Sequence, residues 1–169
     1  MQDCILAIDQ GTTGTTVLII DADMTLLGKA TVEFIQYYPQ AGWVEHDPEE
    51  IWQSVLKTID LGLKAARIDT ARIAAIGITN QRETTVLWDK KTGRAVARAI
   101  VWQDRRTAEL CQKLKSRGLE PFFQTRTGLV LDPYFSGTKI GWLLDKISNL
   151  RRRAARGDVL FGTIDTWLL

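Results

Sequence analysis

The polar stretch from Asp9 to Thr16 is the first group of residues in the chain that could carry chemistry. It directly follows the apolar run Cys4-Ile5-Leu6-Ala7-Ile8. A tight turn here would present backbone N–H groups and hydroxyls to phosphate oxygens. Asp9 could hold Mg²⁺ directly or through water, because Mg²⁺ prefers carboxylate and phosphate oxygens. The chain contains no GxxxxGK[ST] loop, and an ordinary hairpin turn also explains these residues, so the stretch alone favours phosphate binding only slightly.

Arg82 and Glu83 form the second candidate, inside a dense polar cluster between two apolar runs. Together they supply five N–H donors and an anionic acceptor. Such a pair suits the neighbouring hydroxyls of a polyol. A surface hairpin with a salt-bridged tip is equally consistent with the pattern.

Two aromatic residues are candidate contacts for the same small ligand. Trp102 ends an apolar run and could cover the carbon side of a polyol, although a tryptophan of the core is the simpler interpretation. Tyr134, in the stretch Asp132-Pro133-Tyr134-Phe135-Ser136-Gly137-Thr138-Lys139, could offer its hydroxyl to a ligand or pack under its own loop. Ser136 is expected to cap the helix that follows.

The elements that must position these residues begin with three β-rich runs, over 4–8, 15–20 and 26–34. Short turns separate them, which predicts a β-meander. A helix is then expected from Pro48, with Asp47 as its N-cap and Glu50 at capping-box spacing. Its predicted apolar stripe consists of Ile51, Trp52, Val55, Leu56, Ile59 and Leu63.

The rest of the chain alternates further strands with helices. Strands are predicted over 73–78, which is read as buried, and over 84–88, 99–102 and 159–161. Helices are predicted over 105–117, 119–125 and 136–149. The predicted fold class is therefore an α/β domain with a mixed sheet that starts as a β-meander and is flanked by helices. The meander argues against a pure Rossmann fold, in which a helix follows the first strand.

Composition excludes several classes of function. The net charge is +2, from 22 basic and 20 acidic residues, so no basic excess predicts nucleic-acid binding. No apolar stretch approaches the length of a membrane span, and the beginning of the chain does not resemble a signal peptide. Cys4 and Cys111 lack metal-ligand spacing and are expected to be reduced thiols of a cytoplasmic protein.

Five stretches, taken together with their order in the chain, indicate a family more specifically than any one stretch does. These are the turn at Asp9, Gly42-Trp43-Val44-Glu45-His46-Asp47-Pro48, Ile78-Thr79-Asn80-Gln81-Arg82-Glu83-Thr84-Thr85, Ala99-Ile100-Val101-Trp102-Gln103, and the stretch from Asp132 to Lys139. From Ile5 to Leu169 the chain resembles the N-terminal domain of glycerol kinases. These belong to the FGGY carbohydrate kinases, within the actin-like, ribonuclease-H-like ATPase superfamily.

The resemblance implies a role for each candidate residue. Arg82, Glu83 and Tyr134 would hydrogen-bond the hydroxyls of glycerol, and Trp102 would pack against its carbons. Thr12, Thr13 and Gly14 would face the phosphates of ATP, and Asp9 would lie near Mg²⁺. Thr16 stands where relatives commonly carry an arginine, so its contact with the phosphates would lack a charge. The implied reaction is transfer of the γ-phosphoryl group of ATP to glycerol, which gives sn-glycerol 3-phosphate.

The resemblance also implies that the active site is incomplete here. The family's catalytic base is an Asp in a Gly-Asp-Gln segment, which does not occur in residues 1–169. We therefore expect an N-terminal domain over 1–169 that is unfinished at its C-terminal end, contains no catalytic residue and is inactive without a C-terminal domain. The apolar ending Trp167-Leu168-Leu169 is expected to expose surface and to favour a homo-oligomer. The alternatives are a stand-alone, non-catalytic domain, or a kinase for another sugar such as xylulose or gluconate.

Overall fold

The three β-rich runs at the start of the chain form the predicted β-meander. In a computed structural model that describes residues 3–169, the antiparallel strands β1 (Cys4–Gln10), β2 (Gly14–Asp21) and β3 (Leu26–Glu33) follow one another. The strand β5 (Ile73–Asn80) lies parallel to β1, so the four-stranded sheet has the order β3-β2-β1-β5 and is mixed. The predicted fold class is confirmed.

The chain divides into two compact units. The first unit comprises Met1–Gln36, Asp47–Gln81 and Ile164–Leu169, and it contains the four-stranded sheet. The second unit comprises Tyr37–His46 and Arg82–Thr163. The candidate phosphate residues belong to the first unit, and the candidate polyol residues belong to the second.

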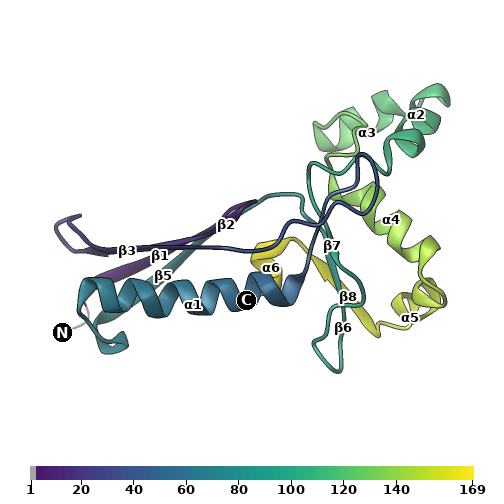
Figure 1. Ribbon diagram of the computed structural model, residues 1–169. Helices are drawn as coiled ribbons and strands as arrows, with labels where there is room; N and C mark the ends of the chain where they lie inside the picture. The colour runs from purple at the N-terminus through teal and green to yellow at the C-terminus, as the bar shows by residue number, and fades with distance from the viewer. Residues whose placement is uncertain (1–2) are drawn as a thin grey trace. The chain divides into compact units, whose positions relative to one another are not determined.

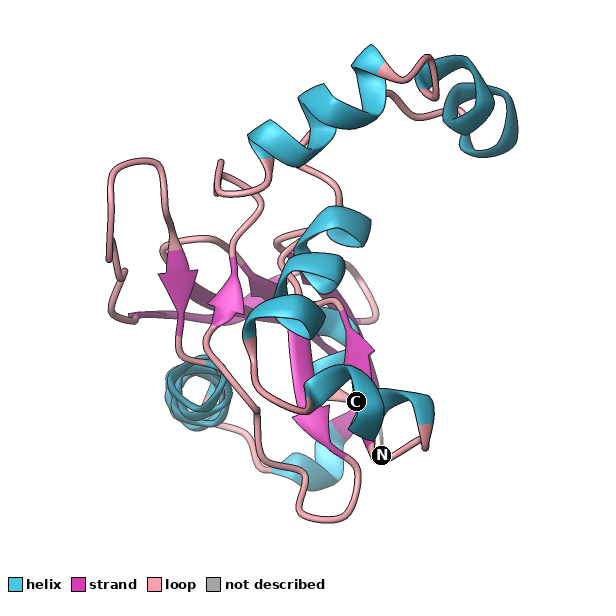
Figure 2. Ribbon diagram, turned by 90° about the vertical axis from the view of Figure 1, so that its right-hand side faces the viewer, coloured by secondary structure: helices cyan, strands magenta, loops and turns pink. Residues whose placement is uncertain are grey.

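The long helix of the first unit, α1 (Pro48–Ala66), begins where the sequence predicts. The Asp47 carboxylate accepts a hydrogen bond from the Glu49 N–H at 2.9 Å, and Pro48 occupies the first helical turn. The helix ends at Arg67, which adopts a left-handed backbone with φ of 55°. It lies along one face of the sheet in Figure 1 and is seen nearly end-on in Figure 2.

The face of α1 that packs on the sheet differs from the predicted stripe. Ile51 and Val55 are buried as expected, but Leu56 is 42% exposed, so its assignment to the buried face is wrong. Small residues take the closest positions instead, namely Ser54, Thr58 and Gly62. The helix and the sheet approach closely at Gly62, where a Cβ would lie 3.0 Å from Val17 Cγ1 of β2. A Cβ at Gly28 of β3 would lie 2.7 Å from the Gly62 carbonyl oxygen.

The strand β5 is predicted as buried, and this prediction is wrong for the described chain. Most of its residues are exposed, and Ile76 is 60% exposed. The reason is topological, because β5 pairs with β1 on one side only and forms an edge of the sheet. A short 3-10 helix, η1 (Thr70–Arg72), leads into it, with Asp69 as its cap.

The second unit contains two small antiparallel strand pairs and four helices among the described residues. The strand β4 (Glu45–His46) pairs with β7 (Ala99–Ile100), and β6 (Val86–Asp89) pairs with β8 (Val159–Gly162). The helices are α2 (Ala108–Ser116), α3 (Glu120–Thr127), α4 (Ser136–Lys146) and α5 (Leu150–Ala155). Leu87, Ile100, Leu143 and Leu150 form the centre of the apolar core of this unit.

The last helix of the chain packs into the first unit, and only the final residue, Leu169, is fully exposed. The last helix is α6 (Ile164–Leu168). Trp167 Nε1 donates a hydrogen bond to the Pro48 carbonyl oxygen at 3.0 Å, and Leu168 packs against the core below the sheet. Only Leu169, at 94% exposure, matches the predicted exposed ending. The prediction that Trp167 and Leu168 expose apolar surface is therefore wrong.

No helix within residues 3–169 is both long enough and apolar enough to cross a bilayer.

Candidate active site

The predicted phosphate turn is the hairpin that joins β1 to β2. The Gly11 N–H donates to the Gly14 carbonyl oxygen at 2.9 Å, which closes the turn around Thr12 and Thr13. Thr13 is exposed at the tip and Thr12 is half-buried. The turn therefore presents hydroxyl-bearing residues at the end of the sheet, as the sequence predicts, while the Gly11 donor is already used inside the turn.

Gly14 has a structural reason to be glycine. A Cβ at this position would lie 2.7 Å from the Val32 carbonyl oxygen of β3. The absence of a side chain lets β2 and β3 pair at this end of the sheet. Close strand packing thus accounts for Gly14 whether or not a phosphate approaches it.

Asp9 and Thr16 lie opposite each other on β1 and β2. Directly opposed residues of an antiparallel pair project on the same face of a sheet. This face is the one away from α1, since the neighbouring Thr15 bonds Ser54 of α1 at 2.7 Å. Thr16 Oγ1 in turn lies 2.9 Å from Thr31 Oγ1 on β3. The sequence places Asp9 just after its strand, whereas it lies inside β1 as an exposed carboxylate in a polar row.

The donor set around Asp9 suits a magnesium ion that is shared with phosphates. Within residues 3–169 no group of three His, Cys, Asp or Glu side chains is placed to share a metal ion. Mg²⁺ is commonly bound through one or two carboxylates, several waters and substrate phosphates. The exposed carboxylate of Asp9, with Thr16 opposite it, fits that mode.

In the second unit, Glu83 is held in an uncommon backbone conformation. Its φ is 66°, in the left-handed region that few residues other than glycine adopt. Its carboxylate Oε2 accepts hydrogen bonds from the Ser136 N–H at 2.8 Å and from Ser136 Oγ at 2.6 Å. Ser136 therefore does not cap α4 with its side chain, as predicted, but fixes the carboxylate of Glu83. A strained residue fixed by its neighbours is typical of a functional site.

Trp102 and Tyr134 lie beside each other in the same unit. Their ring centroids are 5.9 Å apart in an edge-to-face arrangement, and Tyr134 makes a similar contact with Phe135 at 5.1 Å. Both Trp102 and Tyr134 are half-buried, so neither is a plain core residue. Tyr134 and Phe135 directly precede Ser136, whose N–H and hydroxyl bond the Glu83 carboxylate. Ser136 therefore links these aromatic residues to Glu83.

Arg82 precedes Glu83 and is exposed. Of the four predicted polyol residues, Trp102 and Tyr134 touch through their rings, and Glu83 is linked to them through Ser136. Arg82 is adjacent to them through the backbone.

Lys139 is a member of this group that the sequence analysis did not single out. Its side chain is fully buried, and Nζ donates to the Glu83 carbonyl oxygen at 3.0 Å and to the Tyr134 carbonyl oxygen. Burial lowers the pKa of Lys139 from 10.5 to about 8, although the carboxylate of Glu83 acts in the opposite direction. A sequence signal did exist, because Lys139 precedes the buried Leu143 by four residues and thus shares its helix face.

A buried cation supports the segment that follows Trp102. The Arg106 guanidinium bonds the carboxylates of Asp104 and Glu45, each at 2.8 Å. It also lies over the rings of Trp43 and Trp142, at 3.8 Å and 4.7 Å from their centroids. Paired and covered in this way, a buried charge can fix local geometry.

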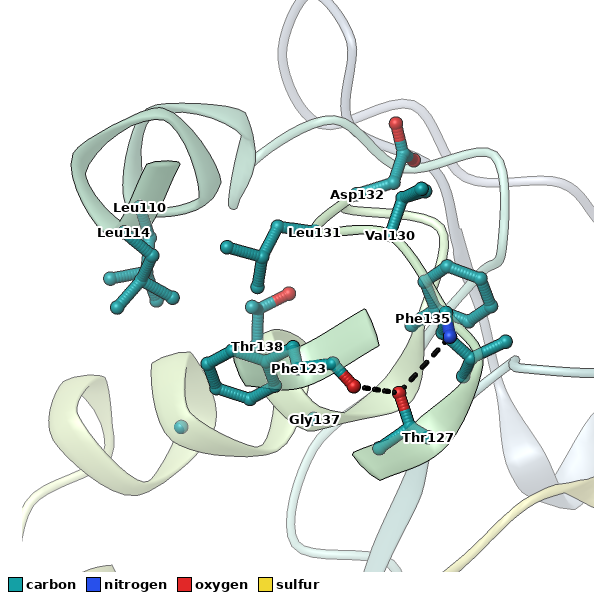
Figure 3. Close-up of a pocket in the computed structure, with 12 residues that line it drawn as sticks. Leu110, Leu114, Phe123, Thr127, Val130, Leu131, Asp132, Phe135, Gly137 and Thr138 are labelled. Carbon is teal, nitrogen blue, oxygen red and sulfur yellow. Dashed lines mark hydrogen bonds between the residues drawn. The ribbon is translucent and has the colours of Figure 1, made fainter. Parts of the chain in front are cut away.

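An apolar cavity of about 440 Å³ lies among α2, α3 and α4. Figure 3 shows Leu110, Leu114, Phe123, Leu131 and Phe135 around it. The hydroxyl of Thr127, at the wall of the cavity, donates a hydrogen bond to the Phe123 carbonyl oxygen at 2.8 Å. The lining is almost entirely hydrocarbon, so this cavity does not suit the hydroxyls of a polyol or the phosphates of a nucleotide.

Comparison with known proteins identifies the family. The N-terminal domain of the FGGY family of carbohydrate kinases matches residues 4–169. The chain belongs to this family. Among curated relatives, it is 61% identical over 165 residues to the glycerol kinase of Agrobacterium fabrum, and 59% identical over 169 residues to that of Brucella ovis. The alignments include 98% and 100% of this chain, but only 33% and 34% of those proteins.

Solved structures of FGGY kinases agree with the fold. The glycerol kinase of Plasmodium falciparum, crystallised with ADP, matches with a TM-score of 0.90 at 33% identity, over 99% of this chain and 33% of that one. The gluconate kinase of Lactobacillus acidophilus matches with a TM-score of 0.82 at 23% identity, over 98% of this chain and 32% of that one. The second match concerns the fold alone. The chain thus has the actin-like ATPase fold of FGGY kinases and spans about a third of their length.

Proposed function

We propose that this FGGY domain supplies the polyol site and part of the phosphate site of a kinase that transfers the γ-phosphoryl group of ATP to glycerol. Glu83, Trp102 and Tyr134 support this function most strongly, because they combine a fixed carboxylate with two half-buried aromatic rings. The names of the relatives from Agrobacterium fabrum, Brucella ovis and Plasmodium falciparum support glycerol as the substrate.

The chemistry of the group fits a small triol. The carboxylate of Glu83 accepts hydrogen bonds from hydroxyls, and the exposed Arg82 donates to hydroxyl oxygens. The Tyr134 hydroxyl can do either, and the ring of Trp102 offers an apolar surface to the carbon chain. Charged acceptors and donors discriminate strongly against analogues that lack a hydroxyl, because their own groups are then left unpaired in the site.

The hairpin of the first unit would serve the nucleotide. Thr12, Thr13 and Gly14 would approach the phosphates, with Thr16 beside them and Asp9 near the metal. Mg²⁺ would neutralise the charge of the transferring phosphoryl group. Asp9 would hold this ion through its carboxylate or through water, and the phosphates would complete the shell. ADP in the Plasmodium falciparum structure supports nucleotide use by this kind of domain.

The catalytic base is not assigned to any residue of this chain. Residues 1–169 would form the N-terminal domain, and the base would come from a C-terminal domain. Phosphoryl transfer depends mostly on positioning and charge neutralisation, so the domain that holds glycerol would contribute through orientation. The 169-residue chain alone is expected to show no turnover of ATP with glycerol above background.

The test uses a joined protein, in which these 169 residues replace the matching third of the Agrobacterium fabrum glycerol kinase. Its turnover is measured with ATP and Mg²⁺ on glycerol, xylulose and gluconate. We expect kcat/KM for glycerol to exceed that for either sugar by about 100-fold or more. A preference for xylulose or gluconate would reject glycerol as the substrate, and a folded joined protein that phosphorylates none of the three would reject the kinase proposal.

A further inference from the structure

A buried ammonium group lies directly behind the proposed polyol site. Lys139 is fully buried, and its two hydrogen bonds go to backbone carbonyl oxygens rather than to a carboxylate. These carbonyls belong to Glu83 and Tyr134, which are residues 51 positions apart in the chain. Burying a lysine is unfavourable unless its donors are used, so the arrangement demands an explanation.

The two carbonyls belong to the two residues whose side chains would meet the polyol hydroxyls. The Glu83 backbone is held at φ of 66°, a conformation that a non-glycine residue keeps only when its surroundings enforce it. Lys139 bonds the backbone oxygen of this strained residue, while Ser136 bonds its carboxylate. The backbone and the side chain of Glu83 are thus fixed separately by two residues of α4.

Tyr134 is fixed by the same lysine. Its carbonyl oxygen accepts from Lys139 Nζ, and its ring packs edge-to-face against Trp102. One ammonium group therefore joins the loop before α4 to the turn before β6.

We propose that Lys139 is a positioning residue for the polyol, which sets the distance between the Glu83 carboxylate and the Tyr134 hydroxyl through their backbones. This inference rests on the proposed function. Lys139 would not touch the substrate itself. It acts because a polyol with neighbouring hydroxyls requires its two partners at a fixed separation, and small displacements of positioning groups are costly in rate.

The first test changes Lys139 in the joined protein. The substitution Lys139→Met removes the ammonium and keeps the length of the hydrocarbon stem. We expect the KM for glycerol to rise about tenfold or more, while the KM for ATP stays within about twofold. The conservative variant Lys139→Arg, which retains donors, is expected to recover most of the loss. Lys146→Met, at an exposed lysine of the same helix, serves as the control and should leave both constants unchanged.

The second test needs no variant and remains valid if Lys139→Met fails to fold. With lysine side chains labelled with ¹⁵N and ¹³C in the joined protein, glycerol is expected to shift the Nζ resonance of Lys139 and not that of Lys146. An unshifted Lys139 resonance at saturating glycerol would overturn the inference. So would a folded Lys139→Met variant whose KM for glycerol stays within twofold, or one in which glycerol and ATP are affected equally. A wild-type joined protein without any glycerol turnover would instead reject the proposed function.

Discussion

Lys139 Nζ donates to the Glu83 carbonyl oxygen at 3.0 Å from a side chain that is fully buried. The pKa of Lys139 is lowered to about 8, and burial is the main cause. The groups that favour its charged form are Glu83, Asp104, Asp132 and Cys111. Below pH 8 the folded chain therefore carries a buried charge, while above it the amine becomes neutral but can still donate hydrogen bonds.

This pKa predicts how stability depends on pH. Between pH 8 and the unfolded pKa of 10.5, the unfolded state binds more protons at Lys139 than the folded state, so stability rises with pH. The wild-type chain should gain about 3 kcal/mol relative to Lys139→Met across this window. Denaturant unfolding of both proteins at several pH values measures the difference. A difference that is flat, or that falls, from pH 8 to pH 10.5 would show that the lysine is not desolvated.

The buried guanidinium of Arg106 predicts a large effect on stability. The substitution Arg106→Met leaves Asp104, which is almost fully buried, without its cation. Breaking a buried pair by removing one partner typically costs about 3–5 kcal/mol. The neighbouring Arg105→Met removes a pair at 3.4 Å whose arginine is 58% exposed, and it should cost less than about 1 kcal/mol. Urea unfolding compares the two, and equal losses would refute the structural role of Arg106.

Two glycines in the sheet predict opposite outcomes. A Cβ at Gly28 would lie 2.6 Å from the Ala66 backbone nitrogen, so Gly28→Ala must push α1 away from β3. We expect a loss of about 1–3 kcal/mol or more. Gly77 in β5 has open space around its Cβ position, so Gly77→Ala should be neutral or stabilising by up to about 1 kcal/mol. Thermal unfolding of both variants measures these changes in stability. A Gly28→Ala variant as stable as the wild type would contradict the close contact of α1 with β3.

Replacing Thr16 by arginine is expected to raise the affinity for the nucleotide. Thr16 lies opposite Asp9 on the open face of the sheet, where related kinases are expected to place an arginine. Thr16→Arg in the joined protein should lower the KM for ATP about three- to tenfold, because a guanidinium can bond phosphate oxygens. Thr31→Arg puts the same charge one strand further from Asp9 and should have a smaller effect. If both variants act equally, the position of Thr16 has no special relation to the phosphates.

Local sequence signals are sufficient to predict the elements that are determined by neighbouring residues. The β-meander follows from three β-rich runs, and α1 begins at Pro48 because Asp47 caps it, as predicted. The burial of β5 could not be predicted in this way. An apolar run reads as buried, but exposure of Ile76 depends on the strand's place at the edge of the described sheet.

The candidate site shows the same limit. The residue types of Glu83, Trp102 and Tyr134 suggested a polyol site, and the structure brings these three residues together. The sequence predicts that Ser136 caps a helix, since a serine before a helical run usually does so. Its actual partner is 53 residues away in sequence, and no local pattern identifies such a contact. The same is true of the bond from Lys139 to the Glu83 carbonyl oxygen, which joins residues 56 positions apart.

The role of Glu83 in glycerol binding is measured most directly by kcat/KM for glycerol of the joined protein and of its Glu83→Gln variant. The amide keeps the shape of the side chain but removes the charged acceptor. We expect kcat/KM for glycerol to fall about 100-fold, with the KM for ATP within about twofold. Glu109→Gln, at an exposed glutamate of α2, should match the wild type. An unchanged kcat/KM for glycerol in folded Glu83→Gln protein would contradict the assignment of the polyol site to this group.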